Sequence, residues 1–237
     1  MKIKKLPAFL AFIIILTVGY LCLQIIPPLL YNDNSTADTN CPQYIIDFVA
    51  NNPQAQTLID HYQATENTDL IDLANPNGID LYLQWDKRWA YTPYGQEIVG
   101  TAGCGPTCLS MVVVGLTGQT EYNPRYIAKY ASENNYLDGS MTKWSLMEIG
   151  CNYFGLQASS VPLSQDSMTK QLQAGHPIIA SMRPGDFTTT GHFIVITKVI
   201  DGKFMINDPN SEENSHKAWS YHQLATQIKA MWSYQKT

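Results

Sequence analysis

An apolar run at residues 107–116 directly follows a Gly-Cys-Gly-Pro-Thr motif at 103–107, and this pair of features constrains the fold most strongly. The run is mostly apolar, which is typical of a helix buried in a core. Pro106 suits the first helical position, because proline has no N–H and the first N–H groups of a helix lack an intrahelical partner. The sequence therefore predicts a buried helix with Cys104 at or just before its N-terminus.

This position favours chemistry at Cys104. The N-terminus of a helix exposes N–H groups and the positive end of the macrodipole, and both favour an anion such as a thiolate. Gly103 and Gly105 let the backbone turn sharply and let a substrate approach closely. Cys104 is therefore a candidate nucleophile, and a buried structural cysteine beside a capped helix is the alternative interpretation.

A β-hairpin is predicted over residues 192–208. Its first half is β-branched and apolar, and Asp201-Gly202 is a turn signal. A two-residue loop at this turn would put His192 and Asp208 on opposite faces. A three-residue loop at 200–202, with Gly202 in a G1 bulge, makes them diagonal neighbours on one face. We favour the three-residue loop, because a histidine can then reach the carboxylate; a surface histidine and an Asp-Pro turn are the alternative.

Cys104, His192 and Asp208 together are the parts that a thiol protease needs. A thiolate attacks the substrate, an imidazole moves the proton, and a third group orients the imidazole.

The chain also resembles a known family, the papain-like cysteine peptidases of the C39 type, specifically the stand-alone bacterial C39-like domains. Residues 79–210 keep the family's order of motifs, and residues 48–53 are similar to a segment that precedes such domains. The motifs are Gln-Trp-Asp-Lys-Arg-Trp (84–89), Tyr-Gly (94–95), Gly-Cys-Gly-Pro-Thr (103–107), Gly-His-Pro-Ile-Ile-Ala (175–180), Gly-His-Phe-Ile-Val (191–195) and Asn-Asp-Pro (207–209). The resemblance implies an α+β fold, with a helical lobe plus an antiparallel β-sheet lobe and the cleft between them.

The resemblance also implies roles for individual residues. Cys104 would be the nucleophile, His192 the general base and acid, and Asp208 the orienting group. Gln84 would offer its side-chain amide to the oxyanion. The chain departs from the transporter-linked C39 peptidases at this point: their glutamine lies a few residues before the cysteine, whereas Gln84 lies twenty residues upstream and Gln96 eight. The substrate cleft is expected to include Gly103, Gly105, Trp144 and Gly191.

The N-terminus indicates where such a domain works. Lys2, Lys4 and Lys5 precede an apolar run at residues 6–26, about the roughly 20 residues that a membrane-spanning helix needs. Basic residues stay on the cytoplasmic side, so the C-terminal domain should lie outside. Cleavage as a signal peptide, with secretion, is the alternative. No Ala-x-Ala-like site is apparent, and residues 20–23 are bulky where a lipoprotein signal has small ones.

The expected organisation has four parts. A signal-anchor or transmembrane segment covers residues 1–27 and a short polar stalk covers 28–42. A helical pre-domain segment follows at 43–78, with Pro53 suited to start its second helix. The C39-like peptidase domain covers 79–237 and begins with helices, including 124–134, 143–154 and 166–174, before strands take over.

Composition narrows the function further. The net charge is −5 and no basic run follows the N-terminus, which argues against a nucleic-acid partner. His61, His176, His216 and His222 are scattered without ligand-like spacing, so no metal or other cofactor is expected. Of the five cysteines, Cys104 and Cys108 form a C-x₃-C pair. A dithiol redox site therefore stays open, although Cys108 falls inside the apolar helix; an oxidising exterior would also permit a Cys108–Cys151 bridge.

The sequence thus predicts a membrane-anchored extracytoplasmic cysteine peptidase that cleaves peptides through a thioester. Three alternatives remain: a peptide-binding module of the same fold without turnover, a dithiol redox protein using Cys104 and Cys108, and use of the same nucleophile for transpeptidation or for amide hydrolysis other than proteolysis.

Overall fold

The computed structural model describes residues 41–62, 73 and 78–237, which belong to one compact unit. The predicted membrane segment at 1–27 and nearly all of the predicted stalk at 28–42 lie outside these residues. No helix within the described ranges is long and apolar enough to cross a bilayer.

The described residues 43–60 of the pre-domain segment fold into short helices, as the sequence predicts. Helix α2 (Gln43–Asn51) is followed by a 3₁₀ turn, η1 (Pro53–Ala55), and by α3 (Thr57–Asp60). Pro53 occupies the first position of η1, where its missing N–H costs no hydrogen bond.

A helical lobe surrounds α5 (Cys104–Thr117), the predicted buried helix, in which residues 105–114 are all buried. The helix ends at Gly118, whose φ of 74° is a left-handed conformation that glycine adopts readily. Pro106 lies at its third position, not the first, but still within the turn whose N–H groups lack helical partners. The other helices of the lobe are α4 (Val99–Ala102), α6 (Pro124–Glu133), α7 (Trp144–Glu148) and the 3₁₀ helix η2 (Gly150–Phe154). Its two small hairpins pair β1 (Pro93–Tyr94) with β2 (Glu97–Ile98) and β3 (Leu137–Asp138) with β4 (Met141–Thr142).

The second lobe is a six-stranded antiparallel sheet with the strand order β5-β10-β6-β7-β8-β9. Its strands are β5 (Leu156–Ser160), β6 (Ile178–Met182), β7 (His192–Ile200), β8 (Lys203–Asn207), β9 (Ala218–Trp219) and β10 (Ile228–Lys236). Three further helices accompany it: α8 (Gln165–Gln173), α9 (Glu212–Ser215) and α10 (Tyr221–Ala225). This mixed arrangement of helices and antiparallel sheet is the one the sequence predicts.

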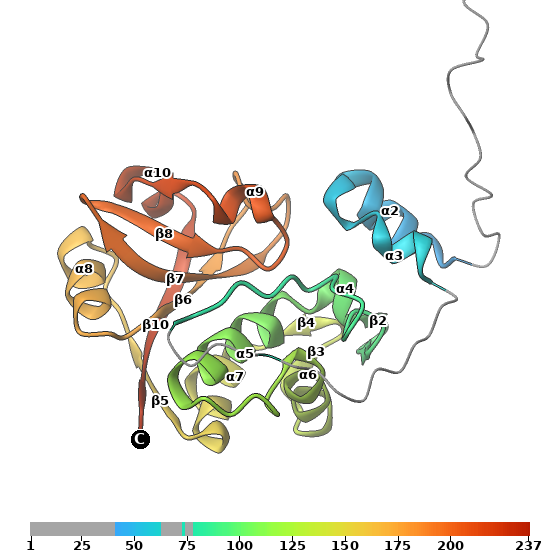
Figure 1. Cartoon of the computed structure of the whole chain (residues 1–237), viewed down its shortest axis with the longest axis horizontal. Coiled ribbons are helices and arrows are strands. Elements are labelled where there is room, and N and C mark those ends of the chain that lie inside the picture. The colour runs from blue at the N-terminus through green and yellow to red at the C-terminus, as the bar shows by residue number, and fades with distance from the viewer. Residues whose placement is uncertain (1–40, 63–72, 74–77) are drawn as a thin grey trace, which may run out of the picture. The chain divides into compact units, whose positions relative to one another are not determined.

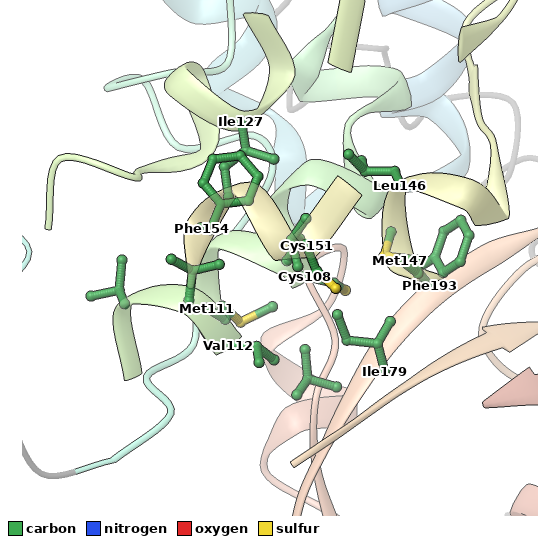
Figure 2. Close-up of a cluster of buried hydrophobic side chains, with 14 of the residues drawn as sticks. Cys108, Met111, Val112, Ile127, Leu146, Met147, Cys151, Phe154, Ile179 and Phe193 are labelled. Atoms are coloured by element: carbon green, nitrogen blue, oxygen red, sulfur yellow. The ribbon is translucent and has the colours of Figure 1, made fainter. Parts of the chain in front are cut away.

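The sheet is covered on both faces, and Figure 1 shows α5 on one side of it and α10 on the other. Ile179, Phe193 and Val195 pack with α5 in one hydrophobic cluster, whereas Ile178 and Ile194 pack with α8 and α10 in another. This alternation along β6 and β7 follows from the period of two of a strand. Figure 2 shows the first cluster, in which Cys108 and Met111 from α5 meet residues of α6, α7 and the sheet.

The hairpin of β7 and β8 corrects one prediction. Ile200 pairs with Lys203, so the loop has two residues, Asp201 and Gly202, and both have positive φ (49° and 73°). The three-residue loop predicted from the sequence is therefore wrong, because an Asp-Gly pair fits the tighter turn. A bulge between Ile196 and Lys198 then shifts the register, so that Val195 pairs with Asn207. The one-residue shift in strand pairing thus comes from the bulge at Thr197 and not from the loop.

Candidate active site

Cys104 is the first residue of α5, directly after the short helix α4 and its end at Gly103. Its side chain is partly exposed and lines a cleft of about 1340 Å³. The N–H groups of the first helical turn have no partner within the helix, so they favour a negative charge at this point.

His192 lies at the start of β7, and its ring faces two of the predicted site residues. Its Nε2 lies 2.7 Å from Asp208 Oδ1, and Cys104 lies close enough to the same ring to raise its pKa. Because Nε2 is occupied by the carboxylate, Nδ1 is the ring nitrogen left for the thiol. The structure thus brings Cys104, His192 and Asp208 together, although 88 residues separate the first two in sequence.

The shared face of His192 and Asp208 follows from the bulged hairpin. His192 alternates along β7 with Ile194 and Ile196, and Asp208 continues the alternation of Phe204 and Ile206 in β8. These four hydrophobic residues all belong to the cluster beneath α8 and α10. The Thr197 bulge keeps both polar residues in step with this face.

Asp208 is held by several donors. Its side chain is 1% exposed, and Oδ1 accepts from the Asn210 N–H at 2.9 Å as well as from His192. The other oxygen, Oδ2, accepts from Asn214 Nδ2 at 2.9 Å, and the Asp208 N–H donates to Ser215 Oγ at 2.9 Å. None of these three supports was predicted from the sequence. The Asn- and Ser-rich tract after Asp208 was the available signal, because such side chains often bond to nearby groups in turns.

The electrostatics of the site favour a charged imidazole. Burial acts to lower the pKa of His192, but the charge and the hydrogen bond of Asp208, followed by the contacts of Cys104, raise this pKa from 6.5 to about 10. An imidazolium at neutral pH can pair with a thiolate and can donate a proton to a leaving group.

Gln84 lies beside this group and lines the same cleft, with only 2% of its surface exposed. Its Nε2 donates to the Gly100 carbonyl at 3.1 Å, and its backbone N–H donates to the Pro209 carbonyl at 2.7 Å. A side-chain amide has two N–H bonds, so the contact with Gly100 uses only one of them. By contrast, Gln96 is exposed and is not a cleft residue.

Only two of the four residues predicted to line the substrate cleft do so in the structure. Trp144 and Gly191 line it, and the Trp144 indole donates to Ser181 Oγ at 3.2 Å while Lys229 Nζ lies 5.2 Å from the ring centroid. Gly103 and Gly105 are buried and do not line it. Their glycine character has another reason. A Cβ would lie 2.6 Å from the Val99 carbonyl oxygen at Gly103 and 2.3 Å from Thr142 Oγ1 at Gly105.

Cys108 and Cys151 offer no second reactive thiol at the site. They form no disulfide with each other in the structure. Both are fully buried, and burial raises the pKa of the Cys108 thiol well above its usual value and that of Cys151 to about 11. A redox dithiol needs an accessible Cys108, and the structure does not provide one. Metal binding is a separate question. Within the described ranges, no group of His, Cys, Asp and Glu is arranged to hold a metal ion.

Comparison with known proteins identifies the class and then the family. The class is that of peptidases of the C39 type: the model of the Peptidase_C39 like family matches residues 77–237. The match covers more than half of the sequence, and the chain therefore belongs to this family, as the resemblance of its motifs had indicated.

Three solved structures are similar to the chain. The peptidase domain of Streptococcus ComA, a bifunctional ABC transporter of a quorum-sensing pathway, is 15% identical, with a TM-score of 0.40 over 56% of this chain and 93% of that one. A C39-like peptidase from Bacillus anthracis is 18% identical, with a TM-score of 0.38 over 67% and 95%. A double glycine motif protease from an AMS/PCAT transporter, solved with its leader peptide, is 13% identical, with a TM-score of 0.35 over 71% and 100%. A search of curated proteins finds no match.

Proposed function

We propose that the protein is a cysteine peptidase that hydrolyses peptide bonds with Cys104 as nucleophile, His192 as general base and acid, and Asp208 as the orienting group. The observation that carries the proposal is the His192 ring, which bonds to Asp208 at 2.7 Å through Nε2 and lines the same cleft as Cys104. Membership of the Peptidase_C39 like family supports the same chemistry.

The proposed reaction has two halves. The Cys104 thiolate attacks the scissile carbonyl carbon, and the resulting oxyanion is stabilised by the Cys104 N–H and by Gln84. The His192 imidazolium then donates its proton to the leaving amine, the C–N bond breaks, and a thioester to Cys104 remains. A water molecule, deprotonated by the neutral imidazole, attacks the thioester. The C–S bond breaks, the peptide acid leaves, and the thiolate and imidazolium are restored.

The proposed substrate is a peptide or an exposed protein segment in extended form. The cleft is large enough for several residues, and Trp144, Met141 and Phe48 offer apolar contacts along its walls. A peptide-binding module without turnover is the alternative that the same cleft leaves open, whereas the burial of Cys108 disfavours a dithiol redox protein.

The experiment that tests this function compares hydrolysis with alkylation in the wild type and in Gln84→Ala. We expect the variant to lose about 100-fold in kcat, because it lacks one donor to the oxyanion. The rate at which iodoacetamide alkylates Cys104 should stay near the wild-type rate, since that reaction forms no oxyanion. Gln96→Ala is the matched control and should retain both rates. If Gln84→Ala and Gln96→Ala hydrolyse peptides at the same rate, Gln84 has no role at the oxyanion. If iodoacetamide alkylates Cys104 in the wild type but the wild type hydrolyses no peptide, the protein is a peptide-binding module without turnover.

The location of the protein is a separate proposal, based on Lys2, Lys4, Lys5 and the apolar run at 6–26. We expect full-length protein in the membrane fraction, and protease added to intact cells should release the domain that carries Cys104. An exclusively shortened and freely soluble protein in the medium would mean that the segment at 1–27 is cleaved as a signal peptide.

A further inference from the structure

Residues 43–60 of the pre-domain segment lie outside the region matched by the family, yet they pack closely on the peptidase lobe. Ile45, Val49 and Leu58 form a hydrophobic cluster with Ala90 and other residues of the lobe. The fit is tight: a Cβ at Gly100, in α4, would lie 2.7 Å from Leu58 Cδ2. The segment is therefore anchored next to the short helix that leads into Cys104.

A second contact joins the segment to the loop that follows Asp208. Asn52, between α2 and η1, donates through Nδ2 to the Asn210 carbonyl at 2.9 Å and to Asn210 Oδ1 at 2.7 Å. Nearby, Gln54 donates to Ser211 Oγ at 3.2 Å and accepts from the Glu212 N–H at 3.1 Å. Two residues of the segment thus hold three consecutive residues of the loop.

These contacts lead directly to the site. The N–H of Asn210 donates at 2.9 Å to Asp208 Oδ1, the same oxygen that binds His192 Nε2 at 2.7 Å. Because Asn52 bonds to both the carbonyl and the side chain of Asn210, it restricts rotation of that residue. The N–H that binds the carboxylate therefore belongs to a residue whose carbonyl and side chain Asn52 holds.

We propose that Asn52 is a positioning residue for Asp208. It acts through Asn210, so the pre-domain segment contributes a residue that positions the carboxylate of the active site. The inference rests on the proposed function for its effect on turnover, but the contact with the His192–Asp208 pair can be measured without turnover. Asn52 acts on the carboxylate, so its loss should lower kcat. Asn52 also lines the cleft, but its side-chain amide is bonded to Asn210, whereas Phe48 offers the cleft an apolar surface from α2 and would act on KM instead.

The test uses three variants of the full-length protein: Asn52→Ala, Asn52→Asp and, as the matched control, Gln56→Ala. Asp has nearly the size of Asn but cannot donate, so it separates lost hydrogen bonds from lost volume. Gln56 is exposed in the same segment, and its side chain bonds only to Asp60 among the contacts described. We measure kcat and KM on a peptide that the wild type cleaves, the melting temperature, and the downfield imidazole N–H signal of His192 in proton NMR.

We expect both Asn52 variants to lose about tenfold in kcat with little change in KM, since both hydrogen bonds to Asn210 are removed and part of this loss reaches the carboxylate. The His192 signal should shift or broaden in both variants and stay unchanged in Gln56→Ala. An unchanged signal in Asn52→Ala would overturn the inference, as would recovery of wild-type kcat in Asn52→Asp. If the wild type has no turnover, the proposed function fails, and the NMR signal still decides the role of Asn52.

Discussion

Cys104→Ala is expected to abolish peptide hydrolysis, whereas Cys108→Ala should retain it. Cys104 is partly exposed in the cleft that His192 also lines, so its loss removes the nucleophile and disturbs the core little. Cys108 is fully buried in the core around α5, and its truncation should lower the free energy of unfolding by about 1 kcal/mol.

Hydrolysis of a peptide mixture and thermal unfolding, measured on both variants, check this expectation. Cys151→Ala is a matched control, because Cys151 is another fully buried cysteine of the same cluster. Loss of activity in Cys108→Ala as complete as in Cys104→Ala, with the fold retained, would favour the redox interpretation over the peptidase.

Substitutions of His192 and Asp208 should have graded effects. His192→Ala removes the proton carrier and should lower kcat by on the order of 10⁴-fold. Asp208→Ala should lose about 10³-fold, and Asp208→Asn less, because an amide can still orient the ring. Asp208→Ala also leaves the Asn210 and Asn214 donors without their acceptor, so its melting temperature should fall as well.

The pH dependence of these variants follows from the pKa of His192. This pKa is raised to about 10 in the folded protein, so the imidazolium that protonates the leaving amine is retained well above pH 6.5 and is lost as the pH rises through about 10. Any stability that the His192–Asp208 pair contributes disappears over the same range. Asp208→Ala removes the negative charge that raises the pKa of His192, and burial alone lowers this pKa. The fall of kcat on the alkaline side of the pH profile should therefore occur at lower pH. An alkaline limb at the wild-type pH would show that Asp208 does not set the charge of His192.

Much of the fold could be predicted because it depends on local pattern. The buried helix after Cys104, the helices at 124–134 and 166–174 and the Asp201-Gly202 turn all have short-range signals. The hairpins β1–β2 and β3–β4 have strands of only two residues, which are too short to show a periodic pattern.

The site itself could be predicted only in part. The motifs indicated Cys104, His192 and Asp208, but the Thr197 bulge depends on strand pairing, which a single strand does not reveal. Likewise, the contact of Asn52 with Asn210 joins residues 158 positions apart, and no local pattern points to it. Gly103 and Gly105 suggested space for a substrate, whereas tight packing against Val99 and Thr142 accounts for them.

The central claim is that Cys104 hydrolyses peptide bonds, and the most direct measurement is cleavage of a diverse peptide mixture in water enriched in ¹⁸O. Mass spectrometry then reads the new C-termini and their isotope. We predict new C-termini that carry ¹⁸O with the wild type and none with Cys104→Ala, since water resolves the thioester. New peptide bonds without ¹⁸O would indicate transpeptidation. A mixture left intact by a wild-type protein whose Cys104 is readily alkylated would contradict the account and leave a peptide-binding module.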